Sequence, residues 1–210
     1  MSAIDLSTFL DALKAPSGAP GGGAASAVAG VLGCALFEMV SGITLSLPRF
    51  TEGREKLEEI RSRSQELRET FLVLAKEDED AYRQVESAMK MPKDSPEEKA
   101  SRKEAMQKAF IAATEIPLKT AENAVLALSL LPDLLQYGNP NAITDAAVGA
   151  LLLDCARRGA VMNAEINMGS IRDETFRETC RKRLTEIREE AQKHLSVMKE
   201  ALVKAGLNPE

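Results

Sequence analysis

Apolar residues recur at steps of three or four along most of the chain, and no stretch alternates convincingly with the period of a β-strand. A short amphipathic segment covers residues 6–14. A much longer pattern precedes Met91, with Leu57, Ile60, Leu67, Phe71, Leu74, Ala81, Val85 and Ala88 on one face. This spacing predicts amphipathic helices.

Local signals place the ends of the predicted helices. Thr51 is the predicted N-cap of the helix that runs to Met91. Ser95 is followed by Pro96 and predicts the N-cap of a helix that reaches about Leu130.

The second half of the chain predicts two further helices. Residues 136–147 contain an Asn-Pro turn signal, after which helices are expected over about 142–168 and 173–205, the last one ending at Gly206. The prediction is an all-α fold: an elongated bundle of long antiparallel helices that forms a single domain over residues 1–210.

A glycine run precedes the most apolar stretch. Gly21, Gly22 and Gly23 are followed by a segment of small residues, 24–47, that ends before a proline. The run lacks the lysine and the preceding strand of a phosphate-binding loop. The segment is long enough to cross a bilayer, but it contains Glu38 and is rich in Ala, Gly and Ser. We therefore favour burial in a bundle or dimer core.

The glycines themselves allow two interpretations. A helix N-terminus presents unpaired N–H groups, and bare backbone lets a ligand approach them closely. A flexible break that permits tight packing explains the glycines equally well.

Composition narrows the function classes. The 210 residues are 44% hydrophobic and only 4% aromatic, and their formal net charge is −5, which argues against a general nucleic-acid binder. Three scattered cysteines favour a reducing, cytoplasmic location without disulfides. A single histidine, His194, excludes a histidine triad or a histidine-rich metal site.

Three groups of polar residues are candidates for chemistry. Asp78 continues the apolar stripe of its helix, where a carboxylate is costly unless it is paired or functional; a solvated acidic face is the alternative. Asp145 lies one turn into a helix, where it either stabilises the helix dipole or binds a ligand. Asn163 and Asn167 are four residues apart on an apolar helix, and their amides need partners from a ligand or from a neighbouring helix.

Four segments, in this order and spacing, resemble the cyclodeaminase/cyclohydrolase family: PGGGAASAVAGVLGCALFEMV, DAYRQVESAMKMPK, GNPNAITDAAVGALL and GAVMNAEIN. This family comprises the C-terminal domain of formiminotransferase-cyclodeaminase and stand-alone methenyltetrahydrofolate cyclohydrolases. The resemblance covers nearly the whole chain and implies an all-α, homodimeric, folate-binding protein.

The resemblance also implies roles for individual residues. Asp78 matches the family's acidic position and is the expected acid/base. The expected substrate-binding residues are Gly21, Gly22, Gly23, Asn139, Asp145, Asn163, Asn167 and, for the anionic glutamate portion of a folate, Lys119. The chain departs from the family pattern at Ala24, at Lys76 and around Arg49.

The expected function is therefore chemistry on the one-carbon unit of tetrahydrofolate, either hydrolysis of the methenyl form or cyclisation of the formimino form with release of ammonia. The apparent absence of a formiminotransferase partner favours hydrolysis. We expect a folate substrate and a homodimer, with no metal, cofactor, nucleic acid or membrane partner. The alternative is a non-catalytic folate-binding or scaffold protein of the same fold.

Overall fold

The computed structural model describes residues 5–208, and all regular structure in that range is helical. The elements are α1 (Leu6–Leu13), α2 (Gly22–Ser46), α3 (Arg54–Met89), α4 (Pro96–Leu128), α5 (Leu131–Tyr137), the 3₁₀ turn η1 (Pro140–Ala142), α6 (Ile143–Met168) and α7 (Glu174–Lys204). The predicted all-α class is confirmed.

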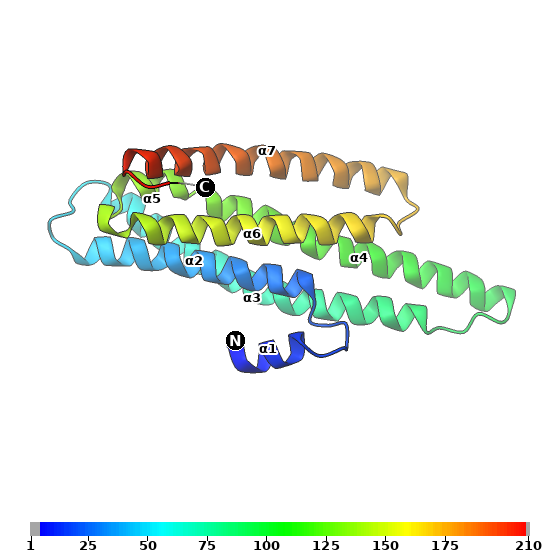
Figure 1. Ribbon diagram of the computed structural model, residues 1–210. Coiled ribbons are helices and arrows are strands. Elements are labelled where there is room, and N and C mark those ends of the chain that lie inside the picture. Colours follow the sequence, from blue (N-terminus) through cyan, green and yellow to red (C-terminus); the bar gives the residue numbers. More distant parts are fainter. Residues whose placement is uncertain (1–4, 209–210) are drawn as a thin grey trace.

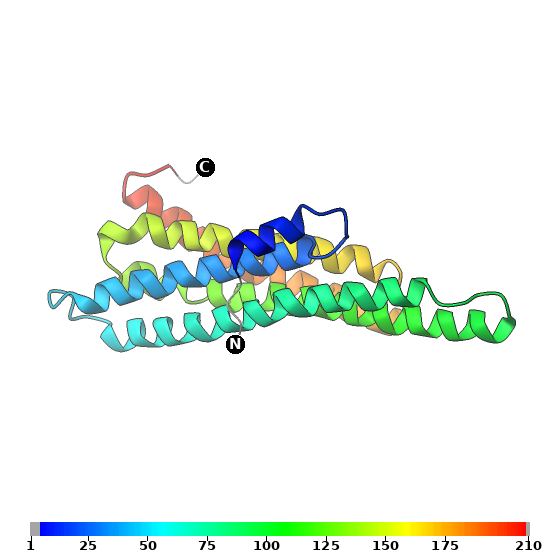
Figure 2. The same cartoon turned by 90° about the horizontal axis from the view of Figure 1, so that it is seen from below.

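Four long helices surround the main core. α2 packs against α3 and α6, and α4 packs against the same two helices from the other side of the core, so α2 and α4 are diagonal to each other. α7 covers α4 and α6 (Figure 1). The hairpin of α3 and α4 extends beyond the start of α2 and the end of α6 (Figures 1 and 2).

Small residues let α2 lie close to its neighbours. A Cβ atom on Gly33 would lie 2.8 Å from the carbonyl oxygen of Gly149 on α6, and one on Gly30 would lie 2.7 Å from the ring of Phe71 on α3. Both positions therefore require glycine. Among the described helices, α2 alone is long and apolar enough to span a bilayer by composition, and here it is a central helix of the bundle with one side exposed.

The start of α3 differs from the prediction. Gly53, not Thr51, is the N-cap, and its φ of 65° lies in the left-handed region that favours glycine. A Cβ atom there would overlap the ring of Tyr137. The packing of Tyr137 against Gly53, two residues far apart in the sequence, thus determines where α3 begins. By contrast, the predicted N-cap at Ser95 is confirmed and forms a capping box with Glu98.

The short helix α5 was not predicted. α4 ends at Leu128 and α5 begins at Leu131, with Pro132 in its first turn. Proline has no N–H to donate to the carbonyl four residues earlier, so Pro132 disfavours continuation of α4 at this position, although α4 does pass through Pro117. The chain turns, and Leu131 and Leu134 become buried in the main core.

Candidate functional site

A carboxylate from α3 meets the first turn of α2. The backbone N–H of Ala24 donates a hydrogen bond to Asp78, and a Cβ atom on Gly23 would overlap the same carboxylate. The N-cap Gly21 has no side chain to cap α2, so Asp78 satisfies one of its free N–H groups. The sequence-predicted pair of glycine run and Asp78 is therefore brought together within one chain.

Burial raises the pKa of the Asp78 carboxyl group above its ordinary value, and the negative charge of neighbouring Glu79 acts in the same direction. The hydrogen bond from Ala24 opposes this shift but does not cancel it. A half-buried carboxylate of raised pKa is a stronger base than an exposed one, and it is placed where it can still exchange protons with solvent or a ligand.

Tyr82 extends this site one helical turn along α3 and was not among the predicted site residues. Its hydroxyl lies where a Cβ atom on Gly18 would be, and Gly18 has a φ of 79°. The ring is 42% exposed. Its spacing of four residues from Asp78 was the available signal, since such residues share one face of a helix.

Asn163 approaches the same turn from α6. Its Nδ2 atom would lie 3.4 Å from a Cβ atom on Gly22, and it donates a 2.8 Å hydrogen bond to the carbonyl of Gly159 on its own helix. Asn163 thus lies beside the glycine run, opposite the α3 side chains.

Asn167 forms a contact between helices. Its Nδ2 atom donates a 2.7 Å hydrogen bond to the carbonyl of Ala113 on α4. That carbonyl would ordinarily accept from the N–H of residue 117, which is Pro117 and has none. Asn167 therefore replaces a hydrogen bond that proline removes, and its predicted part in substrate binding stays a prediction.

Asn139 and Asp145 lie at the other end of the bundle. The backbone N–H of Asn139 donates to Thr44 Oγ1 at 2.9 Å, and Thr44 follows Gly23 by 21 residues on α2, about 31 Å of helix. Asp145 is in the first turn of α6, about 27 Å from Asn163. Within one chain, the residues expected to form a single pocket thus lie at two opposite ends of the bundle. The binding roles of Asn139 and Asp145 stay predictions.

Lys119 is also apart from the glycine run. It is exposed on α4, beside the fully buried Leu118, and α4 lies diagonally across the core from α2. Because Leu118 faces the core, the next position along the helix, Lys119, faces solvent. The structure does not bring Lys119 to the glycine run, and its contact with a glutamate group stays a prediction.

A hollow of about 420 Å³ adjoins the site on the outer side of α2 and α6. Its lining comprises Ala25, Ser26, Leu151, Asp154, Cys155, Arg158, Gly159 and Met162. Ala25 directly follows the residue whose N–H binds Asp78. In residues 5–208, no group of three or more His, Cys, Asp and Glu side chains is arranged to hold a metal ion.

The chain is similar to proteins of one family. The family described as formiminotransferase-cyclodeaminase matches residues 5–186. A methenyltetrahydrofolate cyclohydrolase of Methylorubrum extorquens is 33% identical over 186 residues, covering 89% of each chain. A formimidoyltransferase-cyclodeaminase of Rattus norvegicus is 34% identical over 190 residues, and the match spans 89% of this chain but only 34% of that protein.

A solved structure agrees with the sequence matches. The crystal structure of a formiminotetrahydrofolate cyclodeaminase from Thermotoga maritima superposes with a TM-score of 0.86, covers 96% of this chain and 97% of its own, and is 28% identical. The family match covers most of the chain and the cyclohydrolase relative exceeds 30% identity over most of both chains. The chain belongs to the formiminotransferase-cyclodeaminase family.

Proposed function

We propose that this protein hydrolyses 5,10-methenyltetrahydrofolate to 10-formyltetrahydrofolate. The observation that carries the proposal is the half-buried Asp78 carboxylate, of raised pKa, held against the first turn of α2 by the Ala24 N–H. Similarity to a methenyltetrahydrofolate cyclohydrolase over 89% of both chains supports the choice of reaction.

The proposed chemistry uses the charge of the substrate. The methenyl bridge between N5 and N10 is cationic, and the ionised Asp78 carboxylate stabilises it electrostatically. Asp78 accepts a proton from water as the oxygen bonds to the bridge carbon. The resulting tetrahedral carbon then loses its bond to N5. N5 takes the proton from Asp78, and the hydroxyl releases its own proton to solvent as it becomes the formyl oxygen. General acid–base help of this kind contributes about 10²–10⁴-fold in rate.

Glycine positions the catalytic carboxylate in this proposal. Because a side chain at residue 23 would overlap Asp78, only glycine permits the short approach between α3 and the start of α2. Asn163 beside Gly22 and the exposed Tyr82 ring supply polar and aromatic contacts on either side. The reaction as proposed draws on these side chains and the substrate, with no cofactor.

The second candidate reaction is the cyclodeaminase one. Likeness to the formiminotetrahydrofolate cyclodeaminase of Thermotoga maritima over nearly the whole chain favours it. There N10 would attack the formimino carbon and ammonia would leave from the tetrahedral carbon. The same carboxylate serves both reactions, because each needs a proton acceptor and donor beside one carbon atom.

We also propose that the bundle of antiparallel helices pairs as a homodimer through α2 and α6. Both helices present an apolar stripe to solvent: Leu32, Met39 and Ile43 on α2 and Val148, Leu151, Met162 and Ile166 on α6. Ile166 is 74% exposed. Since α2 and α6 are adjacent, the two stripes form one apolar surface, and exposure of such a surface to water is unfavourable. A second copy on this surface would also cover the hollow beside Ala25.

A soluble, cytoplasmic enzyme fits this proposal, with a folate as substrate and neither nucleic acid nor membrane as partner. Outside α2, the long helices α3 and α7 carry many ion pairs on their surfaces, as expected for helices in water.

Static light scattering at micromolar concentration should give twice the mass of the chain, and a monomer would contradict the dimer.

The reaction is tested by mixing the protein with methenyltetrahydrofolate and following the loss of its absorbance above the uncatalysed rate. A parallel assay measures ammonia released from the formimino derivative. Faster loss of the methenyl form without ammonia release supports hydrolysis, and the reverse supports the second candidate. Folate binding without either activity would support a non-catalytic protein of this fold instead.

A further inference from the structure

The first helix presents an apolar stripe that its own chain leaves uncovered. The stripe comprises Leu6, Phe9, Leu10 and Leu13, which share one side of α1. Leu6 is 59% exposed and Leu10 is 51% exposed, and no residue of α1 is buried. Figure 1 shows α1 apart from the bundle of long helices, and in both views α2 is the helix nearest to it (Figures 1 and 2).

An eight-residue helix such as α1 is not stable in water on its own. At its N-terminus, the Asp5 side chain accepts a 2.8 Å hydrogen bond from the backbone N–H of Thr8. Such a cap contributes about 1 kcal/mol, which offsets the ordering of only about one residue. The stripe therefore has to be covered for α1 to be ordered, and the described part of the chain supplies no helix that packs extensively against it.

The segment after α1 is fixed to the bundle and limits where α1 can lie. Gly18 has a φ of 79°, and a Cβ atom on it would overlap the Tyr82 hydroxyl. Ser17 Oγ donates to the carbonyl of Ala19 at 3.0 Å. From Gly18 back to Leu13, a fully extended chain spans at most about 18 Å. α1 is therefore held beside the start of α2, where the apolar surface of α2 and α6 begins.

The hollow beside Ala25 has the shape and the chemistry that the stripe requires. Leu151 and Met162 line this hollow and are 54% and 63% exposed, so α1 of the same chain does not cover them. A convex apolar stripe and a concave apolar surface are thus both left open near the start of α2. Two copies related by a two-fold axis cover both features, because each contact across the interface then occurs twice.

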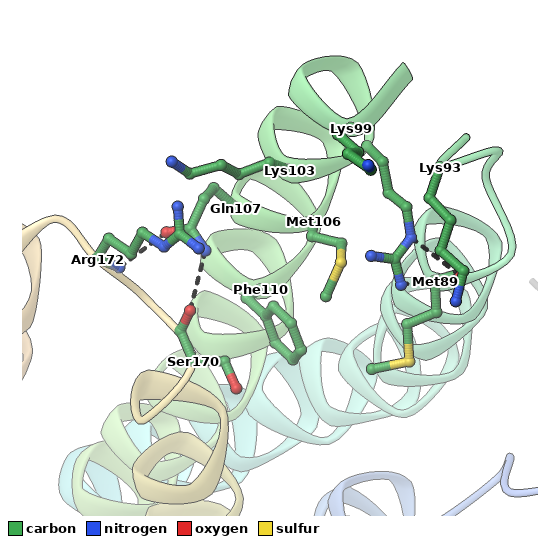
Figure 3. Close-up of a pocket in the computed structure, with 10 residues that line it drawn as sticks. Met89, Lys93, Lys99, Lys103, Met106, Gln107, Phe110, Ser170 and Arg172 are labelled. Atoms are coloured by element: carbon green, nitrogen blue, oxygen red, sulfur yellow. Dashed lines mark hydrogen bonds between the residues drawn. The ribbon is translucent and has the colours of Figure 1, made fainter. Parts of the chain in front are cut away.

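The cavity at the tip of the α3–α4 hairpin is unsuited to α1. It has a volume of about 510 Å³, and Lys99, Lys103 and Arg172 are among the residues that line it (Figure 3). An apolar stripe placed there would remove these cations from water without supplying a counter-charge, which is unfavourable. The hollow beside Ala25 is therefore the better match for the stripe.

We propose that α1 is an arm exchanged between two copies of this chain, with the α1 stripe of each copy packed into the hollow of the other. This inference rests on the proposed homodimer through α2 and α6 and adds a further element to its interface. Exchange of an identical element is a low-cost route to a dimer. A stable interface commonly buries about 800 Å² on each partner, and the arm adds its apolar side to the stripes of α2 and α6.

A disulfide tests which copy the arm contacts. Cys155 lines the hollow and is exposed, whereas Cys34 and Cys180 are buried. Under mild oxidation, Leu10→Cys should bond to Cys155 of the partner subunit, because a disulfide needs Cα atoms within about 7 Å of each other. Non-reducing electrophoresis should then show a covalent dimer. The unmodified protein, Leu10→Cys/Cys155→Ser and Thr8→Cys, which places its thiol on the opposite side of α1, should not form it.

The dissociation constant of the dimer supplies an independent measurement. Leu6→Ser/Leu10→Ser removes apolar burial from both arms and should weaken dimerisation on the order of 100-fold. Val197→Ser/Val203→Ser, which changes exposed apolar residues of α7, should leave the constant unchanged. Light scattering over a range of concentrations gives both values, and circular dichroism checks that each variant keeps its helix content.

The outcomes separate the arm from the dimer itself. A disulfide within one chain, the lack of any cross-link from Leu10→Cys, or equal dissociation constants for the two serine variants would overturn the exchange while the α2–α6 dimer stands. An unmodified protein that is monomeric at micromolar concentration would overturn both.

Discussion

The two ends of α2 use polar groups differently. At its start, the Asp78 carboxylate has one backbone donor, the Ala24 N–H, and keeps a raised pKa. At its end, Thr44 Oγ1 donates to the carbonyl of Val40 at 2.7 Å and accepts from the N–H of Asn139. Asn139 Oδ1 in turn accepts from the N–H of Asn141 at 3.1 Å.

The polar residues around Asn139 hold a turn, whereas the Asp78 carboxylate remains available to a ligand. The bonds around Asn139 join buried groups to one another and fix the connection between α5 and α6, as buried polar groups require. The Asp78 carboxylate, by contrast, is positioned by one backbone donor, the Ala24 N–H. Burial of a carboxylate costs free energy, and the single hydrogen bond to Asp78 does not offset this cost in full. Such incompletely compensated burial is typical of functional sites.

The largest expected effect is that of Asp78→Asn, which should lower kcat by about 10²–10⁴-fold because the amide accepts no proton from water. The fold should persist, since the amide oxygen can still accept from the Ala24 N–H. Steady-state rates are compared with those of Asp80→Asn, which changes an exposed carboxylate paired with Lys76 at 3.2 Å. A near-normal rate for Asp78→Asn would remove this residue from the mechanism.

The same variant has a pH signature. Folding raises the pKa of Asp78, so the ionised carboxylate costs stability above its folded pKa, and this cost disappears below its ordinary pKa. In urea unfolding, Asp78→Asn should therefore be more stable relative to the unmodified protein at neutral pH, and the difference should shrink as the pH falls. The rate of the unmodified protein should fall as Asp78 becomes protonated. A stability difference that grows on acidification would contradict the burial argument.

Gly23→Ala should have the next largest effect on activity. The new methyl group overlaps the Asp78 carboxylate, and displacement of a positioned group by about 1 Å costs on the order of 10²-fold. Gly42→Ala on the same helix is the control, because its Cβ atom would lie 3.9 Å from Arg61 Nε; it should gain about 0.5–1 kcal/mol of stability. Equal kcat/KM for the two variants would show that the close approach at Gly23 is unimportant.

Asn167→Ala should destabilise the fold by about 1–3 kcal/mol, because the carbonyl of Ala113 loses its donor. Pro117→Ala restores a backbone N–H to that carbonyl. Chemical denaturation of both single variants and the double variant gives the coupling energy. The two effects should be clearly non-additive, with Asn167→Ala costing less in the Pro117→Ala background; strict additivity would mean that Asn167 acts elsewhere.

Asp145→Asn should have the smallest effect. In the first turn of α6 the carboxylate stabilises the helix dipole, and its loss should cost about 0.3–1 kcal/mol, while kcat/KM measures whether the residue also binds substrate. Thermal unfolding and steady-state kinetics check both values. A tenfold or larger loss of activity would show that the two ends of α2 meet across a subunit interface, and the contrast between them would then hold only within one chain.

The sequence by itself determined the long helices and several of their ends. Apolar spacing predicted the long helices, and the Ser95 cap with Pro96 is formed as expected, because these features depend on neighbours within one or two turns. The inward position of Asp78 followed from the stripe of its own helix in the same way.

Tertiary structure decided which polar residues meet. Whether Asp78 reaches Ala24, or Asn167 reaches Ala113, depends on how far one helix is shifted along another, and that shift is set by contacts such as Gly33 against Gly149. The sequence grouped Asn139 and Asp145 with the glycine run, yet the lengths of α2 and α6 separate them. Local periodicity fixes the face of a side chain, whereas packing between distant segments fixes its partners.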